Sequence, residues 1–208
     1  DRVTRALETN EDLSRWDVPT LFHLVNVSDL TIHWTCFAGV IFAVLLIIGY
    51  VPRISLAMLG FLYLSVYTVA SPFLSYQWDI LLLETSVIGV ILAPNCRHLS
   101  TLRDWPSNRL GIWLFRILLF KLILSSGLVK LNSGDPTWQD LSALDFHYWT
   151  QPIPHPWSWT IHHLGDFSRI AGTFANHFVE LVIPWLIIFG LPKRLVGAWV
   201  PIMLIGLY

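Results

Sequence analysis

Apolar residues in this chain gather in long runs that are separated by short polar stretches. A transmembrane helix needs about 20 mainly apolar residues to cross roughly 30 Å of hydrocarbon. Runs that reach or approach this length occupy residues 31–50, 54–74, 76–93, 110–131, 168–189 and 194–208. The pattern therefore predicts an all-α protein, a polytopic transmembrane helical bundle with about five to six spanning helices.

Two stretches are too polar to belong to the apolar runs. The first is residues 1–30, which are expected to form an extracytoplasmic polar segment. Residues 31–208 are expected to form the transmembrane bundle, and they contain the second polar stretch. Within the bundle, residues 132–167 form a loop that holds four of the eleven Trp, four of the eight His and four of the twelve Pro. We expect this loop to be an ordered cap of interfacial helix and extended chain.

The distribution of Lys and Arg predicts which side of the membrane the loop faces. Residues 132–167 contain neither Lys nor Arg, although residues 1–30 contain three Arg. The loops predicted on the opposite side carry six basic residues: Arg53, Arg97, Arg103, Arg109, Lys193 and Arg194. Because cytoplasmic loops are enriched in Lys and Arg, the bias favours a lumenal or periplasmic position for residues 132–167.

The composition agrees with lipid as the solvent. Hydrophobic residues make up 54% and charged residues 13% of the chain, and the mean hydropathy is +0.58. A soluble domain carries about 25% charged residues. The net charge of -1, with no basic run, argues against nucleic acid as a partner. Membrane lipids are the partner that the composition predicts, for an integral multi-pass membrane protein.

The polar loop contains a signal for the start of a helix. Asp is a good N-cap and Pro suits the first helical position, so a short helix is expected to begin at Asp135 and Pro136. Four apolar or aromatic residues then recur at helical spacing: Trp138, Leu141, Leu144 and Tyr148. The proline-rich residues 151–156 cannot continue a helix and favour an extended path.

Ionisable residues also occur inside the apolar runs, where each is costly unless it is paired or reaches water. They are Asp79, Glu84, Arg116, Lys121, Lys130, His177 and Glu180. The three acidic residues balance the three basic ones, which suggests a shared intramembrane polar network. Packing ion pairs, with some snorkelling at helix ends, explain the same residues and remain an alternative.

Lys130 closes the fourth apolar run and adjoins the polar loop. Ser126 and Gly127 precede it on the same helical face, and such small-residue faces usually pack against another helix. A lysine in a buried position can also serve as a base, which makes Lys130 a candidate catalytic residue.

No other pattern for catalysis or cofactor binding is present in the sequence. His147 and His155 lack helical ligand spacing, and no Cys accompanies them. The adjacent His162 and His163 point in different directions on a helix. The sequence has no Gly-x-Ser-x-Gly and no glycine-rich phosphate loop. Neither a metal nor a cofactor is therefore expected.

Four stretches carry a resemblance to a known family. They are WDVPTL at 16–21, FLSYQWDILLLET at 73–85, SSGLVKLNSGDPTWQDLSALDFHYWTQPIPHPWSW at 125–159 and FVELVIPW at 178–185. In this order, and over most of the chain, they resemble the lipase maturation factor family. The sequence departs from the family pattern at His155, Thr160 and Gly165.

The resemblance implies a membrane-embedded maturation factor, a chaperone-like helper in the assembly of secreted lipases or similar clients. It implies the endoplasmic reticulum membrane in a eukaryote, or the inner membrane in a bacterium, with residues 132–167 facing the lumen. A first spanning helix before Asp1 and an extracytoplasmic domain after Tyr208 are expected to be missing. The residues expected to be functional in the loop are Asp135, Trp138, His147, Tyr148, Gln151, Pro152 and Trp159.

A shorter similarity points to a different class of function. The spacing of Gly127, Lys130, Leu131, Asp135 and Trp138 is similar to a pattern in the vitamin K-dependent gamma-carboxylase. This similarity implies an intramembrane enzyme that uses Lys130 as base. A third interpretation, transport, depends only on the intramembrane charges. The maturation factor, which needs no catalysis of its own, is the leading hypothesis.

Overall fold

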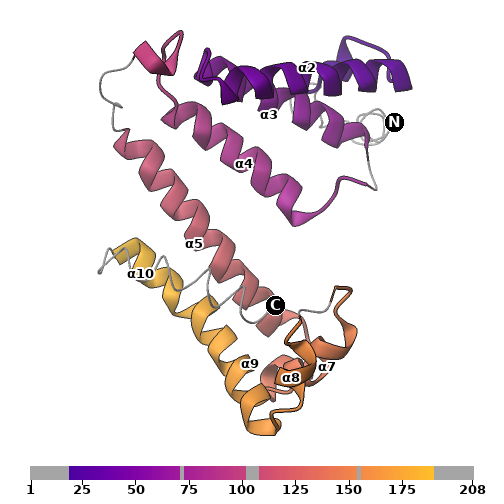
Figure 1. The fold of residues 1–208 in the computed structure, drawn as a ribbon, viewed down its shortest axis with the longest axis vertical. Helices are drawn as coiled ribbons and strands as arrows, with labels where there is room; N and C mark the ends of the chain where they lie inside the picture. Colours follow the sequence, from indigo (N-terminus) through magenta and orange to yellow (C-terminus); the bar gives the residue numbers. More distant parts are fainter. Residues whose placement is uncertain (1–18, 71–72, 102–107, 154–155, 190–208) are drawn as a thin grey trace, which may run out of the picture. The chain divides into compact units, whose positions relative to one another are not determined.

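The regular structure of the protein is helical. The computed structural model describes residues 19–70, 73–101, 108–153 and 156–189. Their helices are η1 (Leu21–His23), α2 (Asp29–Ile47), α3 (Pro52–Val69), α4 (Gln77–Leu92), η2 (Leu99–Thr101), α5 (Arg109–Asn132), α6 (Pro136–Gln139), α7 (Ala143–Thr150), α8 (Ser158–His162), α9 (Asp166–Leu181) and α10 (Ile183–Phe189) (Figure 1). The prediction of an all-α protein is confirmed.

Among the described residues, four helical stretches are long and apolar enough to cross a membrane. They are Asp29–Ile47, Pro52–Val69, Arg109–Asn132 and Asp166–Ile188, and they coincide with four of the predicted runs. The predicted run 76–93 forms α4, which has 16 residues and is therefore about 24 Å long. The predicted run 194–208 lies outside the described residues. The chain is a multi-pass membrane protein.

Residues 1–115 form one compact unit, in which α3 packs against both α2 and α4 (Figure 1). Small residues allow α3 and α4 to approach closely. A Cβ atom on Gly60 would lie 2.6 Å from Ser86 Oγ, well inside normal contact distance. Ser55 and Ser65 on α3 are fully buried. Close packing through small residues is typical of helices in membranes, where burial of apolar surface gives little driving force.

Polar contacts at both ends fix α3 and α4 as an antiparallel pair. At one end, Arg53 at the start of α3 donates to the carbonyl of Ala93, the residue after α4, from Nε (3.0 Å) and Nη2 (2.7 Å). Towards the other end, Tyr63 donates to Asp79 Oδ1 at 2.7 Å. Asp79 Oδ2 also accepts from the backbone N–H of Tyr76 at 2.9 Å, which caps α4. Therefore α4, although short, runs beside the candidate span α3.

Residues 116–208 form the second compact unit, in which α9 packs against α7, α8 and α10. Buried Ile123 from α5 and buried Val179 from α9 pack together, with Ile183 and Ile187 against them. The predicted run 168–189 is not one regular helix but two, because Pro184 has no N–H to donate to the carbonyl of Glu180. The helix accordingly breaks at Val182.

The loop between α5 and α9 folds as a cap of short helices, α6 to α8. Asp135 is the N-cap of α6 and accepts from Thr137 N at 3.0 Å, so the predicted helix start is confirmed. The helix does not continue to Tyr148, however. Asp140 Oδ1 accepts from the N–H (3.0 Å) and the hydroxyl (2.5 Å) of Ser142, which competes with helical hydrogen bonds. Leu141 takes φ 65°, and α7 starts afresh after it.

Candidate functional site in the cap

A buried ion pair joins α5 to α9 directly beneath the cap. Lys130 Nζ lies 2.5 Å from Glu180 Oε1, and the Glu180 side chain is only 3% exposed. The second carboxylate oxygen, Oε2, accepts from Asn176 Nδ2 at 3.1 Å. Both carboxylate oxygens thus have partners, which is the condition under which a buried charge is tolerated.

Gly127 is the residue that brings the two helices close enough for this pair. A Cβ atom at Gly127 would lie 2.7 Å from Leu181 Cδ2 and 2.9 Å from Glu180 Cβ. Lys130 follows Gly127 by three residues and so lies on the same side of α5. The small-residue face predicted from the sequence therefore packs against another helix, α9.

Trp138 attaches the first cap helix, α6, to both helices of this pair. Its ring centroid lies 4.8 Å from Lys130 Nζ, a cation–π contact. Its backbone carbonyl is 2.9 Å from His177 Nε2 on α9, and the His177 ring packs edge-on against the indole ring. Because a carbonyl can only accept, His177 carries a proton on Nε2.

Arg169 attaches the rest of the cap to α9. Its guanidinium binds the carboxylates of Asp145 on α7 and Asp166 at the start of α9. It also donates from Nη1 to the carbonyl of His162 on α8 at 2.7 Å. One side chain therefore holds α7, α8 and α9 together, using the fork of donors that only Arg provides.

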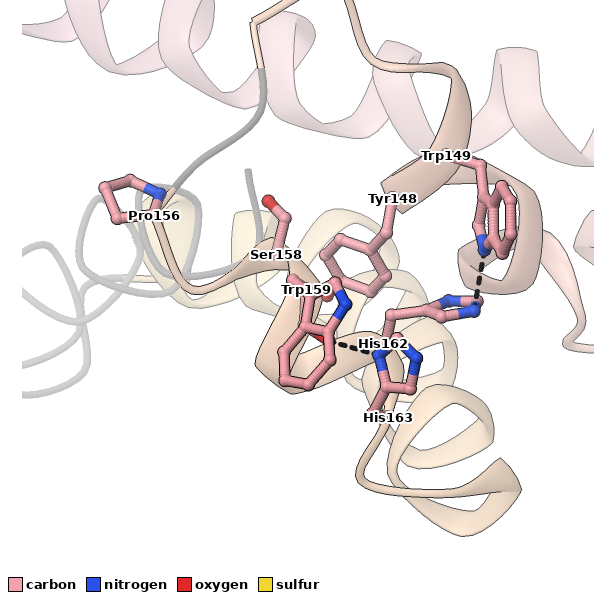
Figure 2. A pocket seen from close by; sticks show the side chains of 7 residues that line it. All are labelled: Tyr148, Trp149, Pro156, Ser158, Trp159, His162 and His163. Atoms are coloured by element: carbon pink, nitrogen blue, oxygen red, sulfur yellow. Dashed lines mark hydrogen bonds between the residues drawn. The ribbon is translucent and has the colours of Figure 1, made fainter.

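A pocket of about 610 Å³ opens between α7 and α8 (Figure 2). Tyr148, Trp149, Ser158, Trp159, His162 and His163 contribute to its lining. Trp149 Nε1 donates to His162 Nε2 at 2.6 Å, and Trp159 stacks on His163 with ring centroids 4.3 Å apart. Gln151 Nε2 donates to buried Ser158 Oγ at 2.5 Å, which joins the end of α7 to α8.

Burial shifts the pKa of two titratable groups on α7. The pKa of His147 is lowered, first by burial, which disfavours the imidazolium, and then by the positive charge of Lys130. Burial likewise raises the pKa of Tyr148, because the phenolate is the charged form. His147 packs edge-on against the Tyr148 ring. Both groups are therefore held in their neutral forms around neutral pH.

The residues predicted for the cap come from three of its short elements. Asp135 and Trp138 belong to α6, whereas His147 and Tyr148 lie on α7. Gln151 ends α7 and Trp159 lies on α8, while Pro152 is exposed between them. Trp138 contacts Lys130, His147 lies close enough to feel the Lys130 charge, and Tyr148 and Trp159 line the pocket. Their joint role in function stays a prediction.

The predicted intramembrane residues fall at several places. Lys130, His177 and Glu180 gather at the α5–α9 junction. Asp79 is buried against α3, as described above. Glu84 lies on α4 beside a mainly apolar pocket of about 550 Å³ between α3 and α4. Arg116 and Lys121 lie on α5. That all seven form one network stays a prediction.

Three residues that sequence reasoning did not select contribute to the cap and its junction. Asn176 precedes Glu180 by four residues, so their shared helical face could have been read from the sequence. Arg169 and His162 gave no comparable signal, because their partners depend on how the cap folds. Among the described residues, no three His, Cys, Asp or Glu side chains group as ligands for a metal ion.

Comparison with known proteins places the whole chain in one family. Residues 2–207 match the model of the lipase maturation factor transmembrane domain. The human protein lipase maturation factor 1 is 34% identical over 187 residues, covering 86% of this chain and 33% of that protein. Lipase maturation factor 2 of Xenopus laevis is 38% identical over 170 residues, covering 80% of this chain and 24% of that protein.

The chain thus spans a third or less of the length of these relatives. Lipase maturation factor 2 of Gallus gallus is 41% identical over 139 residues, covering 66% of this chain and 19% of that protein. No solved structure matches the chain.

Proposed function

This chain belongs to the lipase maturation factor family, and we propose that it forms the membrane-embedded part of a factor that assists the maturation of secreted lipases or similar clients. The family match over residues 2–207 is the observation that carries the proposal. The names of the relatives supply the client class, and the fold supplies a folded polar cap between two spans on which a client could be held.

We further propose that the cap faces the lumen of the endoplasmic reticulum in a eukaryote, or the periplasm in a bacterium. The absence of Lys and Arg from residues 132–167 supports this orientation. Secreted lipases fold in those compartments, so a cap on that side has direct access to an immature client.

The exposed side chains of the cap support its role as the contact surface. Phe146, Trp149, Ile153, Trp157 and Trp159 are all exposed. Clusters of exposed aromatic and aliphatic residues mark interaction sites, because burying them on a partner is favourable. The ion pair and the Arg169 contacts beneath hold this surface in a fixed arrangement, which reduces the entropy that binding would otherwise cost.

Lys130 fits this function as a positioning residue. Its ammonium is engaged by the Glu180 carboxylate and the Trp138 ring, contacts that join the cap to the spans. The comparisons do not favour a carboxylase-type enzyme, and every relative described above is named as a maturation factor.

The proposal is tested by expressing the full-length protein together with a secreted lipase. Phe146→Ala, Ile153→Ala and Trp157→Ala, which truncate exposed side chains of the cap, are expected to lower the lipase activity secreted into the medium, with the abundance of the factor unchanged. Trp34→Ala is the matched control, because Trp34 is a 62% exposed tryptophan on α2 and does not belong to the cap. If the three cap variants support secretion as well as Trp34→Ala does, the cap is not the client surface.

A further inference from the structure

We propose that the pocket between α7 and α8 binds the phosphocholine headgroup of a phospholipid in the surrounding bilayer. The pocket, of about 610 Å³, lies within the range of small-molecule sites, about 300–1,000 Å³. The proposal goes beyond the handling of a client and does not depend on it.

The position of the pocket along the chain places it at headgroup depth. The cap begins where the span Arg109–Asn132 ends, and it ends where the span Asp166–Ile188 begins. Residues between two span ends lie at the membrane surface, where the polar headgroups occupy several ångströms on each side of the hydrocarbon. Exposed Trp157 and Leu164 in the cap and exposed Phe167 at the start of α9 fit an interfacial environment better than open water.

The aromatic side chains of the pocket suit a quaternary ammonium. Tyr148, Trp149 and Trp159 all contribute rings to the lining (Figure 2). Trp159 stacks on His163 with one face and is nonetheless 72% exposed, so its other face is open to a ligand. A trimethylammonium group binds such faces through cation–π attraction and needs no hydrogen-bond acceptor.

His162 supplies a hydrogen-bond donor for the phosphate of the same headgroup. The Trp149 indole can only donate, so His162 Nε2 must accept, and this assigns the neutral ring's proton to Nδ1. His162 Nδ1 is buried and has no hydrogen-bond partner among the described residues. A buried donor without an acceptor is costly. Because this atom is closed to solvent in the structure, a phosphate oxygen satisfies it only after a small shift of the side chains around the ring.

The charges around the pocket select a zwitterion. None of the described lining residues is Lys, Arg, Asp or Glu. An anionic headgroup would therefore find no compensating cation, since the Arg169 guanidinium is engaged by Asp145, Asp166 and the His162 carbonyl. A primary ammonium, as in phosphatidylethanolamine, would find no carboxylate for its three N–H donors. The phosphatidylcholine headgroup has no net charge, and its quaternary ammonium has no N–H donors, so it needs neither a cation nor a carboxylate in the pocket.

The experiment uses the purified full-length protein and native mass spectrometry. The protein is released from nanodiscs that contain equal amounts of phosphatidylcholine, phosphatidylethanolamine and phosphatidylglycerol with the same acyl chains. Preferential retention of phosphatidylcholine is expected. Trp159→Ala should reduce that retention about two- to thirty-fold, the range for loss of one cation–π contact. Trp159→Phe keeps an aromatic face and should retain most of the lipid.

Trp157→Ala is the matched control, because Trp157 is a 62% exposed neighbour that does not line the pocket. His162→Phe keeps a ring but removes the donor, so it should also weaken retention. Equal retention of the three lipids, or equal loss in Trp159→Ala and Trp157→Ala, would overturn the proposal. The assay contains no lipase, so its failure would leave the maturation function untouched.

Discussion

Lys130 is the residue at which the cap and the spans meet. Its neighbours Glu180 and Trp138 come from different elements, α9 and α6. The sequence predicted that Lys130 and Glu180 need partners, because both stand in apolar runs. It could not pair them, because 50 residues separate them and helix packing decides which charges meet. The same reasoning left Asn176 unnoticed, although it completes the carboxylate's hydrogen bonds.

Removing one member of this ion pair should be far more damaging than removing both. Glu180→Leu leaves the Lys130 ammonium, whose side chain is 16% exposed, beside an apolar group, and we expect a loss of about 3–5 kcal/mol in the free energy of unfolding. Lys130→Met together with Glu180→Leu should recover most of that loss. Unfolding of the three proteins in detergent measures the difference. Equal destabilisation in the single and double variants would show that the unpaired Lys130 ammonium is not the source of the loss.

His147 should make the stability of the cap depend on pH. Its pKa is lowered in the folded protein, so between the folded value and about 6.5 the unfolded chain binds more protons. Stability is therefore fully present above about pH 6.5 and falls as the pH decreases through this window. His147→Gln should flatten the profile of melting temperature between pH 5 and 8. Lys130→Met should narrow the window, because it removes one of the two causes of the shift. If His147→Gln left the melting-temperature profile unchanged, the pH dependence would have to come from another titratable group.

At the scale of elements, periodicity predicted where helices form better than where they end. The apolar runs located α2, α3, α5 and α9, and Asp135 located the start of α6. The cap stripe from Trp138 to Tyr148 has helical spacing, but Asp140 and Ser142 form a local turn that periodicity cannot detect. The run 168–189 was predicted without a break, although Pro184 within it is the reason that α9 and α10 are separate helices.

The contact between α5 and α9 should depend on the missing side chain at Gly127. Gly127→Ala places a Cβ atom against Leu181 and Glu180, which we expect to cost about 1–3 kcal/mol of stability. Gly39→Ala on α2 is the control, since a Cβ there meets nothing within 4 Å. That change should stabilise by about 0.5–1 kcal/mol through helix propensity alone. Melting temperatures that rise in both variants would mean that the two helices do not need the close approach.

At the scale of the whole molecule, two loops of the chain lie together at one end of the α3–α4 pair. The residues around Tyr50 and around His98 form an isolated backbone bridge, and Arg53 reaches Ala93 beside it. Both connections, α2 to α3 and α4 to α5, therefore lie at one end of this unit. The basic residues Arg53 and Arg97 belong to that end, which is the distribution expected of a cytoplasmic face. The sequence already predicted these two loops on one side, because the run 76–93 that forms α4 was among the predicted spans. The structure adds the backbone bridge and the Arg53 contact that hold the two loops together.

Chemical labelling tests the resulting sidedness. In a Cys36→Ser, Cys96→Ser background, Gln139→Cys reports on the cap and Asn95→Cys on the connection before α5; both side chains are exposed. A membrane-impermeant maleimide applied from the non-cytoplasmic side should label Gln139→Cys at once. Asn95→Cys should react only after the membrane is permeabilised, because the span α5 separates the two positions. Labelling of both cysteines before permeabilisation would contradict the proposal that α5 crosses the membrane between them.

The contact between Arg53 and Ala93 also relates the order of synthesis to the depth of insertion. Arg53 is made 40 residues before the carbonyl that it binds. Until α4 has been translated, only water and headgroups can satisfy the guanidinium, so we expect the start of α3 to stay at the bilayer surface. α4 then inserts beside a helix whose depth is already set. We therefore expect Arg53 to limit how deeply α3 inserts during biosynthesis, before its side chain binds the Ala93 carbonyl in the folded pair.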